Sequence, residues 1–397
     1  MLPSAFRLQP ECIKDTALAV AALRTQGSRR GLYLLSSMWA RHIKTEIQMA
    51  HCTYLWTVYL ALGLACAPSL GSATEKSPSE TSTFTFIFEN DLFANSDNQY
   101  TSGLQIGWMS PDLKHYEEEQ RLPRWLLPVV HAMPFINVPD SQHNIGFTIG
   151  QQTFTPNDTQ ARTIVKDDRP YAGWLYGGLS FISKNESVLD TLEVQLGVVG
   201  PWSLAEDAQR LVHDIRNLET PKGWDNQIKN EPGIVLIYEQ KRRILQSNNA
   251  TGLGYDVITH AGGALGNVAT YLNAGGEVRV GWNLPGDYGT SIIRPGGDTN
   301  APTSVNDPRL TSSEAIGFYV FGGISGRLVL RDIFLDGNSF ANSHSIDKEP
   351  LVGDAVVGAS LTLRNWKLSY SQALRTREFE DQHGVHNFGS ISLSYTF

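Results

Sequence analysis

The chain is dominated by segments in which apolar and polar residues alternate with a period of two. The final segment is the clearest, because Ile391, Leu393, Tyr395 and Phe397 alternate with serine and threonine. Such alternation is typical of β-strands whose two faces meet different surroundings. We count twelve such segments, with approximate centres at residues 88, 105, 148, 178, 194, 239, 259, 275, 323, 358, 371 and 391. The pattern therefore predicts an all-β protein.

Two all-β architectures share this alternation. A soluble sandwich turns its apolar faces inward, whereas a transmembrane barrel turns them outward to lipid. Long strands, faces rich in Gly, Ser, Thr and Gln, and the terminal Phe397 favour the barrel. An aromatic residue at the end of the last strand resembles the assembly signal of bacterial outer-membrane barrels. We therefore predict an antiparallel transmembrane β-barrel of about twelve strands in the bacterial outer membrane, with Phe397 addressing the barrel-assembly machinery.

An even number of strands places both chain termini on the periplasmic side. The connections after odd-numbered strands then face outward. Two of the periplasmic connections, 111–142 and 283–313, are longer than the short turns expected there. The first of them contains a candidate interfacial helix over residues 122–133.

One N-terminal segment resembles a membrane helix but is too short for one. The apolar residues 54–64 fall well below the length of about 20 that spans a bilayer. Small residues follow, up to Ala73, so we predict a secretory signal that is cut after Ala73. A buried core helix and a lipoprotein anchor at Cys66 are the alternatives. The expected organisation is a removed extension, residues 1–73, and an outer-membrane barrel domain, residues 74–397.

Composition narrows the function classes. The 397 residues carry a net charge of −8, which argues against a nucleic-acid partner. The three cysteines all lie within the first 66 residues, so the predicted barrel has neither disulfides nor Cys-based metal sites. The leader holds seven Lys/Arg and three Asp/Glu, so its removal changes the net charge from −8 to −12. Met38 and Met49 are alternative start positions to Met1, so the length of this leader is open.

Four polar clusters interrupt the predicted wall. They are residues 89–91, 100–103, 167–174 and 200–232, and strand parity places all four at the outer rim. Asn90 and Asp91 have two interpretations. Asn-Asp at a strand end is ordinary turn chemistry, but carboxylate and amide oxygens also suit Ca²⁺.

The last cluster contains a short extracellular helix, predicted around residues 203–217. Ser203 opens a Ser-x-x-Glu capping box. Apolar residues follow at helical spacing, namely Leu204, Ala208, Leu211, Val212 and Ile215. The opposite, polar face is expected to look into the barrel mouth, with His213 across a cleft from Asn90 and Asp91. A solvated surface histidine is the alternative.

Taken together, the motifs resemble the lipid A 3'-O-deacylase family of outer membranes. They are Glu89-Asn90-Asp91, Tyr100-Thr101-x-Gly103, Asp168-Arg169-Pro170-Tyr171-Ala172-Gly173, Gly200-Pro201, Gln209-x-x-x-His213 and Gly223-Trp224-x-x-Gln227-x-x-Asn230-Glu231-Pro232. The resemblance runs over the whole mature chain, with the motifs in order. It implies a twelve-stranded barrel that acts as a Ca²⁺-dependent carboxylic ester hydrolase. The substrate would be lipid A, from which the enzyme removes the 3'-linked acyloxyacyl chain.

The resemblance also assigns roles to residues. Asp91 would bind Ca²⁺, Asn90 would share in the metal and oxyanion site, and Thr101 would be a polar group of the cleft. His213 would be the general base that activates water, as in a mechanism resembling that of secreted phospholipase A2. Substrate-binding or supporting positions would be Asp168, Arg169, Arg162, Lys166 and Gln209. Among these, Arg162 and Lys166 are the cations of the loop that precedes the Asp-Arg motif.

Two other functions remain open from the sequence. The barrel could hydrolyse another lipid ester on the same scaffold, or it could be a non-enzymatic porin-like or structural protein. A channel predicts a wide lumen with charged rings. Twelve strands form a narrow barrel that interior side chains can largely fill, which favours the enzyme.

Overall fold

The structure, a computed structural model, describes residues 80–91, 99–119, 121–133, 136, 138, 141–216, 218–249, 252–289, 293, 300–304, 306–311 and 316–397. The chain divides into two units, Met1–Leu70 and Gly71–Phe397, and the described residues all belong to the second. The predicted signal peptide, its cleavage after Ala73 and the alternative anchor at Cys66 lie outside the described residues.

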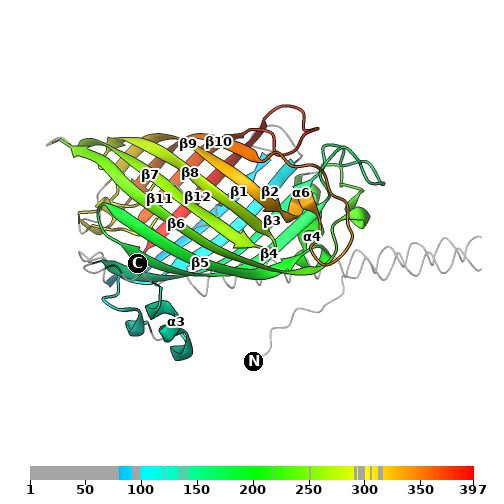
Figure 1. The fold of residues 1–397 in the computed structure, drawn as a ribbon. Helices are drawn as coiled ribbons and strands as arrows, with labels where there is room; N and C mark the ends of the chain where they lie inside the picture. Colours follow the sequence, from blue (N-terminus) through cyan, green and yellow to red (C-terminus); the bar gives the residue numbers. More distant parts are fainter. Residues whose placement is uncertain are drawn as a thin grey trace, which may run out of the picture. The chain divides into compact units, whose positions relative to one another are not determined.

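Twelve antiparallel strands of the described chain close into one barrel (Figure 1). They are β1 (Thr83–Asn90), β2 (Gln99–Met109), β3 (Gln142–Thr155), β4 (Ala172–Lys184), β5 (Val188–Val199), β6 (Glu231–Asn248), β7 (Leu253–Gly266), β8 (Ala269–Trp282), β9 (Ile316–Asp332), β10 (Leu351–Leu363), β11 (Trp366–Arg375) and β12 (His386–Thr396). Each strand pairs with its neighbours in sequence, and β12 closes the barrel on β1. The predicted fold class and strand count are confirmed.

The two faces of the wall follow the predicted alternation. On β3, Ile149 is 57% exposed on the outer face, whereas the neighbouring Thr148 is buried in the lumen. On β12, Ser390, Ser392 and Ser394 are likewise buried. Apolar side chains outside and polar ones inside are stable only where the surrounding solvent is lipid. This arrangement is the reverse of a soluble sandwich.

The two ends of the barrel carry different connections. Figure 1 shows α4 (Ala205–Arg216) and α6 (Ile333–Asp336) at one end, and α3 (Leu127–His131) at the other end with the C-terminus. The helix expected over residues 122–133 is shorter than predicted, because a 3-10 turn, Arg124–Leu126, precedes α3. None of the helices in the described part of the chain has the length and apolar character needed to cross a bilayer.

Described residues of the long connection between β8 and β9, among them Asp287, lie in the lumen. Asp287 is fully buried and accepts hydrogen bonds from Lys367 Nζ (2.7 Å), Arg279 Nη1 (2.6 Å) and Arg309 Nη2 (3.1 Å). Lys367 belongs to β11 and Arg279 to β8, so this ion network joins separate parts of the inner wall. Buried charges are tolerated when they are paired in this way. Paired side chains therefore cross the lumen at this level.

Candidate active site

Three neighbouring strands present polar groups on the outer face of the wall near its rim. Asn90 continues the alternation of Phe84, Phe86 and Phe88, which is the outward-facing series of β1. The pairing of β2 with β3 shifts by one residue between Tyr100 and Ser102, which leaves Thr101 in a β-bulge.

The bulge changes the direction of Thr101. Its Oγ1 lies 2.7 Å from Oγ1 of Thr155, which continues the outward series of β3. The preceding Tyr100 instead packs inside the barrel between Phe154 and Phe388. Thr101 and Asn90 therefore lie on the same, outer side of the wall.

Asn90 is the last residue of β1 and Asp91 follows it, and both are buried. Asp91 is 0% exposed and Asn90 is 3% exposed. No group of three or more His, Cys, Asp or Glu residues that could hold a metal ion occurs among the described residues. A cation here would be held by the Asp91 carboxylate and the Asn90 amide oxygen. Such hard oxygen donors suit Ca²⁺ better than the softer transition metals.

Helix α4 packs on the outer face of β3 and β4. Gly173, on the outward side of β4, lies so close to Ser203 and Ala205 that a Cβ atom there would collide with both. Gln151, on the outward side of β3, donates from Nε2 to the carbonyl oxygen of Ser203 (2.6 Å). The expectation that the polar face of the helix is directed into the barrel mouth is therefore wrong, because the residues at the start of the helix contact the outer face of the wall.

The helix turns its polar side to the wall. Ala205, Gln209 and His213 repeat every four residues and are buried, His213 to 1% exposure, whereas Ile215 is 61% exposed. The side of the helix that faces the wall thus carries Gln209 and His213. The exposed side is mixed, with Asp207 and Asp214 beside Ile215.

The start of the helix also differs from the prediction. Ser203 belongs to a 3-10 turn, Pro201–Ser203, and its hydroxyl donates to the carbonyl oxygen of Gly200 (2.6 Å). Leu204 then adopts a left-handed conformation, with φ of 58°, and α4 begins at Ala205. Ser203 therefore does not form the expected capping box, although the predicted helix itself is present.

A backbone carbonyl orients the imidazole of His213. Its Nδ1 lies 2.7 Å from the carbonyl oxygen of Glu219. Since a carbonyl can only accept, Nδ1 carries the hydrogen, and Nε2 becomes the basic nitrogen of the neutral ring. Sequence reasoning missed Glu219, because any residue can supply a backbone carbonyl and no pattern marks it.

A tryptophan holds the neighbouring residue on the same helix face. Trp224 Nε1 donates to Gln209 Oε1 (2.8 Å), and the Trp224 ring packs against Tyr171 with their centroids 4.9 Å apart. With Ala205 they form a small apolar cluster outside the barrel. The sequence marked Trp224 as part of a motif but assigned it no role, which is to support the helix that carries His213.

Asp168 organises the loop between β3 and β4. Its Oδ1 accepts from Gln99 Nε2 (3.2 Å) and from the backbone N–H of Arg169 (2.8 Å). Its Oδ2 accepts from the backbone N–H of Asn157 (2.6 Å). These contacts are internal to the rim, so the role that the structure leaves for Asp168 is support.

Arg169 points into the barrel and away from α4. It is buried, and its guanidinium lies over the rings of Phe154 and Phe379, 5.2 and 5.8 Å from their centroids. It also pairs with Glu378 (3.3 Å) in the connection between β11 and β12. Burial raises the pKa of the Glu378 carboxyl, but the facing guanidinium groups of Arg169 and Arg375 outweigh it and lower that pKa below its usual value. Arg169 thus connects the β3–β4 loop to the β11–β12 connection.

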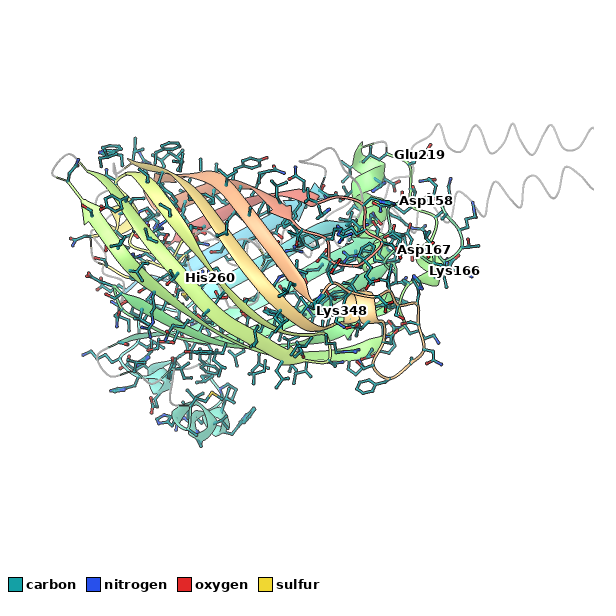
Figure 2. All side chains as sticks on the ribbon, turned by 45° about the horizontal axis from the view of Figure 1, so that its top comes forward. Asp158, Lys166, Asp167, Glu219, His260 and Lys348 are labelled. Carbon is teal, nitrogen blue, oxygen red and sulfur yellow. The ribbon has the colours of Figure 1, made fainter. Side chains whose placement is uncertain are left out.

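Arg162 and Lys166 lie elsewhere on the same loop and are exposed. Figure 2 shows Lys166 at the outer end of the barrel together with Asp158, Asp167 and Glu219, whereas His260 lies well away on the wall. The backbone carbonyl of Arg162 accepts a hydrogen bond from Asn226 Nδ2 (2.9 Å), which ties this loop to the one that follows α4. Both cations are therefore exposed on the loop between β3 and β4.

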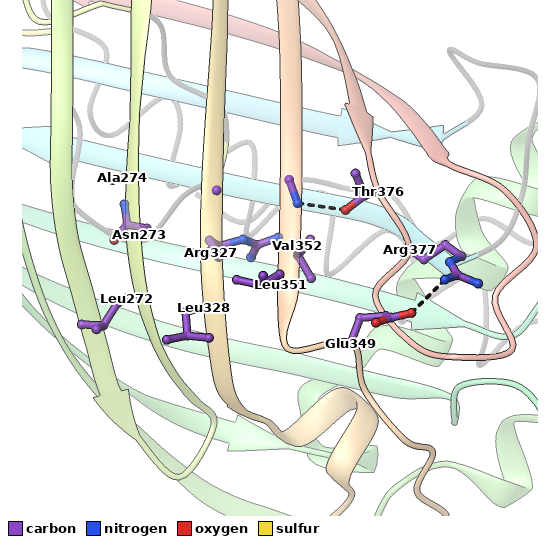
Figure 3. Close-up of a pocket in the computed structure, with 12 residues that line it drawn as sticks. Leu272, Asn273, Ala274, Arg327, Leu328, Glu349, Leu351, Val352, Thr376 and Arg377 are labelled. Carbon is purple, nitrogen blue, oxygen red and sulfur yellow. Dashed lines mark hydrogen bonds and ion pairs between the residues drawn. The ribbon is translucent and has the colours of Figure 1, made fainter.

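A groove of about 630 Å³ lies on a different part of the wall (Figure 3). It is formed by β8, β9, β10 and the connection that follows β11, with Leu272, Leu328 and Leu351 among its lining residues. The polar groups described above belong to β1 to β4 and to α4, which are not adjacent to these strands in the barrel. The groove lacks their chemistry, and we do not assign the site to it.

We expect Gly173→Val to detach α4 from the barrel without unfolding the barrel. The added side chain would occupy the space of Ser203 and Ala205. Limited trypsin digestion should then cut after Arg210 at least about tenfold faster, because local opening controls such cleavage. Gly177→Val is the matched control, since Gly177 lies on the same face of β4 and a Cβ there meets only Thr148 O at 3.9 Å. Equal cleavage of the two variants would contradict the packing described here.

Comparison with known proteins gives one family and one fold. Residues 56–397 match the model of a family described as outer membrane protein LpxR. Among solved structures, LpxR from Salmonella typhimurium shares 20% identity and a TM-score of 0.61, over 79% of this chain and 100% of that one. The β domain of the Bordetella autotransporter BrkA shares 8% identity and a TM-score of 0.36, over 79% and 97% of the two chains. No curated protein matches the chain.

Proposed function

Because the chain belongs to the LpxR family of outer membrane proteins, the lipid A 3'-O-deacylases that its motifs resemble, we propose that it is a Ca²⁺-dependent ester hydrolase that removes the 3'-linked acyloxyacyl chain from lipid A. The protein is an outer-membrane β-barrel. The finer parts of the proposal are the metal, the general base and the bond that is cleaved.

The observation that carries the proposal is the orientation of His213. A buried histidine with a backbone carbonyl on Nδ1 is set up to accept a proton at Nε2. It lies on the wall-facing side of α4, and Asn90 and Thr101 lie on the outer face of that wall. A reaction centre between helix and wall would open sideways, toward the outer leaflet in which lipid A resides.

The chemistry can be written with the side chains of this chain. His213 Nε2 would take a proton from a water molecule as the water oxygen attacks the ester carbonyl carbon. The Asn90 amide would donate a hydrogen bond to the carbonyl oxygen as its negative charge develops. When the bond to the sugar oxygen breaks, His213 would return the proton to that oxygen, and a fatty acid would be released. No serine or cysteine nucleophile is needed.

The residues fit the implied cation. Asp91 is a fully buried carboxylate directly after β1, and a carboxylate is the kind of hard oxygen donor that Ca²⁺ prefers. Asp91 and the Asn90 side-chain oxygen would hold Ca²⁺. When bound, the cation would supply electrostatic stabilisation of the oxyanion.

The substrate would be held by its charge and by its chains. Arg162 and Lys166 are exposed at the outer end, where they would pair with the phosphates of lipid A. This local attraction matters because the body of the protein carries a net negative charge. Asp168, Arg169 and Gln209 would support the loops and the helix around the reaction centre.

The proposal is tested by incubating purified protein with lipid A and recording product masses. We expect loss of one acyloxyacyl unit in Ca²⁺ and no change in chelator. Cleavage of phospholipid with lipid A left intact would favour the alternative of a different lipid ester. No cleavage of either lipid would favour a non-enzymatic barrel.

Recognition of Phe397 by the barrel-assembly machinery is a separate proposal. Deletion of Phe397 tests it, and we expect the deletion to reduce the amount of folded barrel in outer membranes.

A further inference from the structure

A carboxylate inside the barrel lies directly beside the candidate site on β1. Glu89 precedes Asn90 and, by alternation, points into the lumen, where it is buried. Its Oε2 accepts a hydrogen bond from the Tyr100 hydroxyl (2.9 Å), and its Oε1 accepts one from the backbone N–H of Ile293 (2.6 Å). Both carboxylate oxygens are therefore in use, and neither contacts the outer face.

Gly103 makes room for this arrangement. A Cβ atom at this position would collide with the Tyr100 hydroxyl and would lie 2.8 Å from Ile293 Cδ1. Gly103 is also the residue that pairs with Glu89 across β1 and β2. Glu89 and Tyr100 thus face the lumen, whereas their sequence neighbours Asn90 and Thr101 face the outer side of the wall.

The contact occurs where the hydrogen-bonded ladders end or are interrupted. Pairing of β1 with β2 ends at Asn90 and Ser102, and the bulge at Thr101 interrupts the pairing of β2 with β3. A bulge locally disrupts the ladder and increases the twist of the strand. The hydrogen bond from the Tyr100 hydroxyl to the Glu89 carboxyl at this point can hold the two strand ends in register.

The geometry points to Glu89 and Tyr100 as positioning residues that act through the wall. Their hydrogen bond fixes the backbone of Asn90 and Thr101 from the lumen side, and the inward-folded connection contributes the third contact through Ile293. The inference rests on the proposed function for the activity it affects. Neither residue touches the substrate.

Tyr100→Phe tests this in the full-length protein, because it removes one hydroxyl and keeps the ring packing. With lipid A as substrate, we expect kcat to fall about tenfold, as for the loss of one buried hydrogen bond. The Ca²⁺ concentration for half-maximal activity should rise several-fold, while KM stays within about twofold. Glu89→Gln, which keeps the shape but not two equivalent acceptors, should act in the same direction.

Tyr176→Phe is the matched control. Tyr176 is also a buried lumen tyrosine whose hydroxyl bonds a side chain, that of Gln105 (3.0 Å), but it does not adjoin the strand ends. We expect its kcat and Ca²⁺ dependence to equal those of the unmodified protein. Equal effects of Tyr100→Phe and Tyr176→Phe would overturn the inference.

A second measurement separates this inference from the proposed function. Hydrogen–deuterium exchange of the amides of Asn90 and Thr101 should accelerate at least about fivefold in Tyr100→Phe and not in Tyr176→Phe. If the unmodified protein does not cleave lipid A, the proposed function fails, and the exchange result alone decides whether Tyr100 holds these strand ends. Unchanged exchange in Tyr100→Phe would overturn the inference whether or not the protein is a deacylase.

Discussion

His213→Asn is expected to lower kcat for lipid A deacylation by about a thousandfold while the barrel stays folded. General acid–base catalysis contributes about 10² to 10⁴ in rate, and the asparagine amide cannot replace the basic Nε2. The same amide nitrogen can still donate to the Glu219 carbonyl in place of Nδ1, so α4 should keep its position. Initial rates with purified variants measure the effect, and heat-modified mobility on gels monitors the fold.

His260→Asn is the control for this variant, because His260 lies on the wall away from α4 (Figure 2). We expect its rate to equal that of the unmodified protein. His213→Gln extends the comparison, since its longer side chain places an amide nearer the position of Nε2 but cannot accept a proton there. Retention of more than about a tenth of the rate in both His213 variants would remove His213 from the role of general base.

Asp91→Asn is expected to raise the Ca²⁺ concentration for half-maximal activity by at least about thirtyfold. The substitution removes the one charged donor that we assign to the cation, and charge count dominates the affinity of calcium sites. Addition of a chelator to the unmodified protein should abolish activity, and Ca²⁺ should restore it. Mg²⁺ should restore little, because it demands a smaller and more rigid octahedral set of oxygens.

Asp167→Asn controls for the loss of one negative charge at the same end of the barrel. Asp167 is exposed on the outer loop beside Lys166 (Figure 2). We expect no change in its Ca²⁺ dependence beyond about twofold, because solvent and salt screen an exposed charge. Activity of the unmodified protein that persists in chelator would contradict the metal proposal altogether.

Much of the fold was predictable because the alternation is a local property of each strand. Ser390 faces the lumen and Ile391 faces lipid, and the same alternation of polar and apolar residues recurs along the wall. Twelve strands could therefore be counted from the sequence without knowledge of any contact. Strand parity then placed the polar clusters at one end, which the structure confirms for the loops of Asp168 and α4. The existence of α4 was equally local, since it follows from helical spacing of apolar residues.

The sequence could not place these pieces on one side of the wall or the other. The apolar stripe of α4 was compatible with several surroundings, and the close approach of Gly173 to Ser203 decided that the helix lies outside the barrel. The direction of Thr101 depends on a bulge, because one extra residue in a strand reverses which face follows. No sequence pattern indicated that the Glu219 carbonyl would bind His213 or that Asp287 would lie in the lumen.

The residue types and their order were thus sufficient to predict a lipid-facing barrel with a polar rim. The alternation within a strand and the preference of each side chain for lipid or water are local properties, and strand parity follows from the strand count. Which groups share a surface required the folded chain. Contacts such as Gly173 with Ser203, His213 with Glu219 and Glu89 with Tyr100 join residues whose proximity depends on the path of whole loops and strands. Those contacts orient the side chains of the sequence motifs on the wall and on the helix.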